Sequence, residues 1–120
     1  HFVLNCLGMM KGGEIFIPKI PSCRITDLAD VIAPECEKIV TGIRPGEKLH
    51  EILITEDESR HTVEYEDFYK ILPEFNFWTE DTFEDQTGTK LEGGWEYSSN
   101  QNRDWLTKEQ IKRIINENKQ

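Results

Sequence analysis

Residues 12–21 read GGEIFIPKIP, and this stretch decides how the first half of the chain folds. Two successive glycines suit the left-handed backbone that ends a helix. The apolar residues that follow Glu14 predict a short, largely buried strand. Because proline donates no hydrogen bond to a sheet, Pro18 and Pro21 indicate a loop at the carboxyl end of that strand. We therefore expect a helix, a glycine turn, a strand and a loop in that order.

Helices are expected on both sides of this stretch. The preceding helix has apolar residues at the spacing of one helix face: Phe2, Val3, Cys6, Leu7 and Met10. The following helix is expected to have Thr26 as its N-cap and to end before Pro34, which forbids further helix.

The middle of the chain predicts a further strand, a turn and a short helix. The strand is expected over residues 37–42, and a tight turn over residues 42–48 leads into the helix. The inward face of that helix is expected to consist of Leu49, Ile52 and Leu53. Thr55 and Glu58 have the spacing of a capping box, although no long helix follows them. Residues 63–72 alternate loosely between apolar and polar and predict one extended strand.

The carboxyl-terminal quarter ends in an amphipathic helix. Residues 78–94 before it are polar and turn-rich, without a dependable period. Thr107 and Gln110 form a capping box, and Leu106 is placed to staple onto Ile111. Ile111, Ile114 and Ile115 then fall on one side of the helix.

Composition excludes several classes of protein. The chain has 120 residues, which suits one domain, and a formal net charge of −9, which argues against a nucleic-acid binder. No apolar run approaches the length of a membrane span. The three cysteines form no CxxC pair, so a disulfide framework or a zinc site is not expected. The negative charge is local, because residues 56–85 contain eleven acidic residues and two basic ones.

The turn over residues 42–48 is the strongest candidate for chemistry. Arg44 has a planar guanidinium that can hold a phosphate through two hydrogen bonds, and Glu47 has acceptors suited to sugar hydroxyls. Pro45 and Gly46 fix the backbone bend between them. The alternative is a plain turn in which Arg44 pairs with a neighbouring carboxylate, and from the residues alone we favour that alternative.

The other candidates are weaker. Lys19 follows the first strand, at the end where ligands sit in open α/β sheets, but from the residues alone we favour a rigid connector with Lys19 in solvent. His50 and His61 have no third ligand at a usual metal spacing, and the tryptophans are expected to pack rather than to stack on a ligand. The chain lacks GxGxxG, Walker, GxSxG and HExxH motifs and a Tyr-x-x-x-Lys pair, so it has no self-contained active site.

Six segments, taken in order, carry a family resemblance. They read GGEIFIPKIPS at 12–22, ITDLA at 25–29, GIRPGEKLHE at 42–51, LITEDE at 53–58, YSSN at 97–100 and WL at 105–106. This series resembles the carboxyl-terminal part of the extended short-chain dehydrogenases/reductases of the polysaccharide-biosynthesis branch. Residues 79–93 match no part of that family, and Cys23 stands where an apolar residue is expected.

The resemblance implies a fold and a division of labour. The fold class is α/β, the substrate-binding subdomain of a Rossmann-type enzyme whose nucleotide-binding part is absent from this chain. Residues 1–13 would be the last helix leading out of the Rossmann domain, and residues 14–120 the small substrate-binding domain. That Rossmann domain would hold NADP and the catalytic residues, so no catalytic, cofactor-binding or metal-binding residue is assigned here. Arg44 and Glu47 would contact the UDP-sugar, which favours the ligand role for the turn over the plain one.

The implied activity is that of a cytoplasmic lyase. It is the NADP-dependent 4,6-dehydration of UDP-N-acetylglucosamine with inversion at C5, which serves pseudaminic acid, surface polysaccharide and flagellin glycan synthesis in bacteria. The implied partners are the UDP-sugar, the Rossmann domain of the same protein and further copies of the full-length chain. Nucleic acid and membrane are not expected. Two alternatives stay open: a sibling activity (an epimerase of the same family or a configuration-retaining dehydratase) and a stand-alone acidic interaction module.

Overall fold

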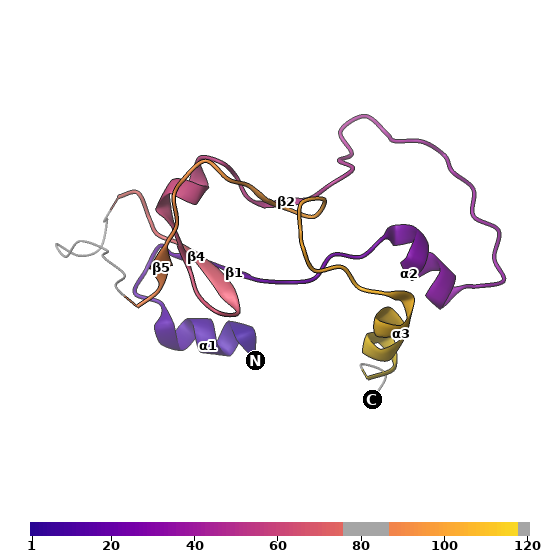
Figure 1. The fold of residues 1–120 in the computed structure, drawn as a ribbon, viewed down its shortest axis with the longest axis horizontal. Coiled ribbons are helices and arrows are strands. Elements are labelled where there is room, and N and C mark those ends of the chain that lie inside the picture. Colours follow the sequence, from indigo (N-terminus) through magenta and orange to yellow (C-terminus); the bar gives the residue numbers. More distant parts are fainter. Residues whose placement is uncertain (76–86, 118–120) are drawn as a thin grey trace. The chain divides into compact units, whose positions relative to one another are not determined.

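The computed structural model describes residues 1–75 and 87–117 (Figure 1). The elements run in the order α1 (Phe2–Met9), β1 (Ile15–Pro18), α2 (Ile25–Ile32), β2 (Ile52–Ile54), the 3-10 turn η1 (Glu58–His61), β3 (Thr62–Glu64), β4 (Phe68–Ile71), β5 (Thr89–Lys90), β6 (Tyr97–Ser98) and α3 (Lys108–Glu117). The chain divides into two compact units. The first comprises His1–Lys19 with Ile52–Tyr97, and the second Ile20–Glu51 with Ser98–Gln120.

The first unit is built on an antiparallel sheet with the strand order β1-β4-β3-β5. Strands β3 and β4 form a hairpin, in which the amide of Tyr65 donates to the carbonyl of Phe68 at 2.9 Å. Strand β1 lies at the edge and pairs Ile17 with Tyr69 and Phe16 with Lys70. A two-stranded sheet joins β2 to β6.

Different side chains pack on the two faces of the four-stranded sheet. Side chains alternate along a strand, so Ile17 and Ile71 share one face and pack with the fully buried Ile54 of β2. Tyr69, Trp95 and Tyr97 surround this small core. The opposite face is aromatic: Phe68 contacts Phe16 at 5.9 Å, Phe2 of α1 at 6.0 Å and Tyr65 at 4.4 Å between ring centroids. Lys70 is only 9% exposed, and its ammonium lies over the rings of Phe16 and Tyr65.

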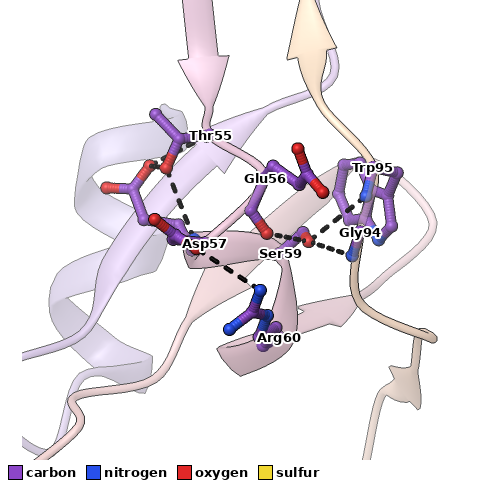
Figure 2. Close-up of polar contacts among 8 residues, drawn as sticks. Thr55, Glu56, Asp57, Ser59, Arg60, Gly94 and Trp95 are labelled. Atoms are coloured by element: carbon purple, nitrogen blue, oxygen red, sulfur yellow. Dashed lines mark hydrogen bonds and ion pairs between the residues drawn. The ribbon is translucent and has the colours of Figure 1, made fainter.

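A buried serine joins two distant segments of the first unit. Ser59 is 0% exposed, and its hydroxyl donates to the carbonyl of Glu56 at 2.6 Å (Figure 2). The same oxygen accepts from the amide of Gly94 at 2.9 Å and from that of Trp95 at 3.4 Å. This single side chain therefore fixes the irregular segment that carries Trp95 against the 3-10 turn η1 before β3.

The second unit is held by two helices and a backbone bridge. Ser22 forms a parallel bridge with Trp105, and the amide of Leu106 donates to the carbonyl of Ser22 at 2.8 Å. Helix α2 packs against α3 through a charged cluster in which Lys108 contacts Asp30 at 2.5 Å and Asp27 at 3.7 Å. Lys38 also pairs with Asp30.

Locally determined features follow the sequence-based expectations. Helix α1, the turn after it and strand β1 lie where expected, and Gly12 and Gly13 both have positive φ. Both capping boxes form: Thr55 with Glu58, and Thr107 with Gln110. The fold class is confirmed as far as its mixed α/β composition, with an antiparallel sheet.

Some local expectations need correction. Pro18 belongs to β1 rather than to a loop, because β1 is an edge strand whose proline requires no ladder partner on its open side. Strand β1 is also less buried than expected, since only Ile17 among its residues is buried. The N-cap of α2 is Arg24, without a side-chain cap, so Thr26 lies inside the helix.

Three further expectations about the middle of the chain are wrong. Residues 37–42 form no strand, because within the described residues no strand lies alongside to pair with them. Residues 49–53 form no helix, since Ile52 and Leu53 enter β2. Residues 63–72 are not one strand, because the chain reverses after Glu64 to make the β3–β4 hairpin. The turn-rich stretch 78–94 lies largely outside the described residues, with β5 in its described part.

Large apolar side chains remain exposed on both units. Helix α1 has no buried residue, and Val3, Leu4 and Leu7 are each at least 60% exposed. In the second unit the most exposed of these residues are Ile25, Ile32, Ile39, Val40, Ile43 and Leu49. No helix in the described part of the chain combines the length and the apolarity that crossing a bilayer requires.

Candidate functional site

The turn predicted from the sequence is present, and Glu47 closes it. The amide of Glu47 donates to the carbonyl of Arg44 at 3.0 Å, and the amide of Arg44 donates to Oε2 of Glu47 at 2.9 Å. Gly46 has a φ of +87°, as the position after a proline requires in a type II turn. Pro45 and Gly46 thus hold Arg44 and Glu47 at the two ends of one tight bend.

The guanidinium of Arg44 faces solvent. Its side chain is 84% exposed, and that of Glu47 is 51% exposed. The ion pair between them is loose, with 3.9 Å from Nε to Oε1, and exposed pairs of this kind add little stability. The contact involves Nε, so in the described part of the chain the two terminal nitrogens keep the donor geometry that a phosphate needs. The arrangement suits an anion that arrives from outside this turn.

Two roles are considered for the Glu47 carboxylate: holding the turn and accepting a hydrogen bond from a ligand. One carboxylate oxygen already accepts from the backbone of Arg44, and the other contacts its guanidinium. Each carboxylate oxygen has a second lone pair, so Glu47 can hold the turn and still accept from a sugar hydroxyl. The structure shows the first role, and the second stays a prediction.

Lys19 is engaged in the first unit. Its ammonium contacts Oε1 of Glu64 at 2.7 Å, donates to the carbonyl of Tyr65 at 2.6 Å and lies 4.9 Å from the centroid of the Tyr69 ring. The side chain is 28% exposed. Lys19 is therefore not free in solvent on a connector: it ties β1 to the β3–β4 hairpin, and a ligand contact by the same ammonium stays a prediction.

Other titratable groups serve the fold. Hydrogen bonds from the Thr55 hydroxyl and amide lower the pKa of Glu58, as expected for the acid of a capping box. Hydrogen bonds from Lys108 and then Lys38 lower the pKa of Asp30 to about 2. Histidine, cysteine and acidic residues form no group that could hold a metal ion within the described ranges, 1–75 and 87–117. The free cysteines Cys6, Cys23 and Cys36 form no disulfide.

Sequence reasoning missed the polar contacts around Ser59. Thr55 and the ion pair of Asp57 with Arg60 lie around the serine in Figure 2. The Thr55 hydroxyl in turn donates to Glu58. An open groove of about 500 Å³ lies on this side of the first unit, lined by Arg60 and His61 among others. A single serine within a polar run carries no signal of burial, so only the pairing with Gly94 and Trp95 reveals it.

These observations define a mixed α/β chain with a small antiparallel sheet and an exposed Arg-Pro-Gly-Glu turn. Residues 1–73 match the family described as polysaccharide biosynthesis protein, and the chain belongs to that family. The family resemblance carried by the six segments is thereby confirmed.

Two curated relatives share the name UDP-N-acetylglucosamine 4,6-dehydratase (inverting). Both come from Campylobacter jejuni subsp. jejuni, one from serotype O:2 with 45% identity and one from serotype O:23/36 with 42%, each over 120 residues. Each comparison covers 96% of this chain and 36% of the relative. The chain thus spans about a third of the length of these relatives.

A solved structure has the same fold. The X-ray structure of Pen from Bacillus thuringiensis matches with a TM-score of 0.75 and 28% identity, over 97% of this chain and 35% of Pen.

Proposed function

We propose that this chain is the UDP-sugar-binding part of a nucleotide-sugar 4,6-dehydratase, of the type that acts on UDP-N-acetylglucosamine with inversion at C5. The observation that carries the proposal is the exposed turn, which presents Arg44 to solvent in a chain 45% identical to a protein of that name. Arg44 binds the diphosphate through its terminal nitrogens, and Glu47 accepts from a hydroxyl of the nucleotide.

NADP belongs to a different part of the enzyme in this proposal. A dinucleotide site needs a parallel strand followed by a glycine-rich turn and a helix N-terminus. The described sheet is antiparallel, and the loop between β1 and α2 contains Pro21 and no glycine. The residues present do not fit the cofactor. We therefore assign NADP and the catalytic groups to a Rossmann domain of the same protein, and no catalytic step to this chain.

The exposed apolar residues support an enzyme part over a free-standing acidic module. An isolated module would keep its large apolar side chains covered, whereas Val40 is 94% exposed and Leu49 is 80% exposed. The complete enzyme is proposed to work in the cytoplasm, as a homo-oligomer, in the synthesis of pseudaminic acid for surface polysaccharides or flagellin glycans.

The test is the affinity of the longer polypeptide for UDP-N-acetylglucosamine after Arg44→Ala. A hydrogen bond to a charged group contributes about 1.5–3 kcal/mol, so we expect affinity to fall roughly ten- to a hundred-fold. Arg44→Lys should recover part of this loss, because it keeps the charge without the two-pronged geometry. Arg103→Ala, which removes another exposed arginine of the second unit, serves as the control.

Two outcomes would contradict the proposal at different points. Unchanged affinity in Arg44→Ala would remove the turn from the binding site. An epimer instead of a 4-keto-6-deoxy sugar inverted at C5, identified by NMR of the product, would keep the binding role and replace the activity with that of a sibling enzyme.

A further inference from the structure

The Arg44–Glu47 turn lies in a long stretch with little regular structure of its own. Residues 33–51 contain turns but no helix or strand. Irregular loops longer than about 12–15 residues are uncommon in compact domains and usually have a function. In the described part of the chain, the hydrogen bonds of residues 39–50 all lie within the turn itself. The position of the turn therefore depends on how the two ends of the stretch are held.

Ser99 holds the carboxyl-terminal end of this stretch. It follows β6 directly, and its partner Glu51 directly precedes β2. The amide of Ser99 donates to the carbonyl of Glu51 at 2.8 Å, and the amide of Glu51 donates to the hydroxyl oxygen of Ser99 at 3.1 Å. Glu51 lies four residues after Glu47, which is at most about 14 Å of extended chain. Both backbone groups of Glu51 are thus fixed by one residue, close to the turn.

The carbonyl of Ser99 extends this contact to the rest of the second unit. It accepts from the hydroxyl of Ser22 at 2.8 Å, and Ser22 is only 9% exposed. The backbone of Ser22 is fixed in turn, because its amide donates to the carbonyl of Asp104 at 2.9 Å and its carbonyl accepts from the amide of Leu106 at 2.8 Å. Ser99 therefore uses its amide, its hydroxyl and its carbonyl to join three segments of the chain. We call the hydrogen bonds of Ser99 with Glu51 and Ser22 the Ser99 clamp.

The amino-terminal end of the stretch has an ionic anchor. Lys38 pairs with Asp30 of α2, which also accepts from Lys108 of α3. The side chains of Lys38 and Asp30 are 39% and 32% exposed, and ion pairs exposed to this degree add little stability and weaken with salt. The Ser99 clamp consists of hydrogen bonds that include a part-buried one, so it is the stronger constraint on the turn.

We propose that Ser99 is a positioning residue for substrate binding, which sets where the turn presents Arg44 to the UDP-sugar by clamping Glu51. Ser99 is not assigned to the ligand and acts through the turn. A loop that is already held in its binding conformation loses less conformational entropy when the ligand arrives, so the clamp raises affinity without adding a contact. The inference rests on the proposed function for the identity of the ligand, whereas the clamp itself does not depend on it.

The test is a double-mutant cycle in the longer polypeptide, measured by equilibrium binding of UDP-N-acetylglucosamine. Ser99→Ala removes the acceptor of the Glu51 amide, and we expect affinity to fall about two- to tenfold, as for the loss of one neutral hydrogen bond. In an Arg44→Ala background the same change should lose most of its effect, because the residue through which Ser99 acts is gone. A similar fall in both backgrounds would show a merely structural role and overturn the proposal. Unchanged affinity in Ser99→Ala, where Arg44→Ala lowers it, would overturn it as well.

Further variants separate the clamp from general stability. Ser99→Thr keeps the hydroxyl and should restore affinity to near that of the unaltered protein. Ser98→Ala removes the neighbouring hydroxyl, which donates to Asn100 at 2.9 Å, and should leave affinity unchanged even where it lowers the melting temperature. An equal loss of affinity in Ser98→Ala would count against the clamp. If Ser99→Ala does not fold, Ser22→Ala loosens the same clamp from its other side and enters the same cycle.

Cleavage by trypsin provides a readout that needs no substrate. Lys48 lies three residues before Glu51, whereas Pro45 protects the bond after Arg44 from trypsin. Ser99→Ala should speed cleavage after Lys48 by at least about threefold, because cleavage follows local opening. Faster cleavage in Ser99→Ala, with unchanged affinity in Arg44→Ala, would support the clamp and refute the proposed function of the turn. Unchanged cleavage and affinity in Ser99→Ala, with lowered affinity in Arg44→Ala, would overturn the clamp and retain the proposed function.

Discussion

Ser59 illustrates how much one hydroxyl can determine in a small unit. It is fully buried and interacts with three backbone groups, two of them on the segment that brings Trp95 to the core. Removing the hydroxyl takes away the acceptor of the Gly94 and Trp95 amides at part-buried contacts, which costs more than the loss of a fully exposed hydrogen bond.

Ser59→Ala should therefore destabilise the first unit. We expect a loss of about 1–3 kcal/mol in the free energy of unfolding, with faster hydrogen exchange at Gly94 and Trp95. Chemical unfolding measures the first and exchange the second. Thr41→Ala removes an exposed hydroxyl and should leave both unchanged. A stability equal to that of the unaltered chain would mean that the hydroxyl contributes little to the anchor.

Substitution by alanine is expected to have opposite effects on stability at two glycines, Gly88 and Gly8. A Cβ on Gly88 would lie 2.9 Å from the carbonyl oxygen of Glu64, which is backbone and cannot turn away, whereas a Cβ on Gly8 of α1 would meet nothing within 4 Å. We expect Gly88→Ala to lower the melting temperature. Gly8→Ala should raise the stability of α1 by about 0.5–1 kcal/mol, because alanine loses less backbone entropy than glycine in a helix. The pair is compared by thermal unfolding, and a similar shift in both would contradict the packing around β5.

At the scale of elements, the contact between α2 and α3 depends on charge. Asp30 accepts from Lys108 and pairs with Lys38, and Asp27 adds a second contact to Lys108. Hydrogen bonds from Lys108 and Lys38 lower the pKa of Asp30 to about 2, and the hydrogen bond to Asp30 raises the pKa of Lys108. A lowered carboxyl pKa in the folded state favours folding above the unfolded pKa.

The sign of the pH dependence follows. The contribution of Asp30 is fully present above its ordinary pKa of 3.8 and is lost as the pH falls towards about 2. We expect the stability of the unaltered chain to fall more steeply between these values than that of Asp30→Asn, and added salt to reduce the difference, because the groups are exposed. Unfolding midpoints at several pH values measure this. Parallel curves for the two proteins would show that the pair contributes no pH dependence.

Elements formed by neighbouring residues were predictable, and those that need distant partners were not. The glycine turn, both capping boxes and the Arg44–Glu47 turn depend on residues within a few positions of one another. The β3–β4 hairpin looked like one strand, because the reversal after Glu64 lacks the Asn-Gly or Asp-Gly pair that marks a tight hairpin. Residues 37–42 have the composition of a strand, but a strand also requires an edge to pair with. For the site, the turn was predictable and the contacts of Lys19 and Ser59 were not, since both depend on distant segments.

At the scale of the whole molecule, the exposed apolar surface is the property that distinguishes an enzyme part from an independent module. Helix α1 is apolar on nearly all sides, yet none of its residues is buried, and a helix of that kind normally lies within a larger core. We expect the 120-residue chain to bind an apolar dye more strongly than the longer polypeptide does. The change of Leu4 and Leu7 to Gln, at positions 68% and 60% exposed, should lower dye binding by the short chain without lowering its stability. In the longer polypeptide the same double change should be destabilising, because there the two leucines would face a neighbouring domain. Equal dye binding by the two proteins, with no loss of stability in the longer one, would instead favour a chain that functions alone.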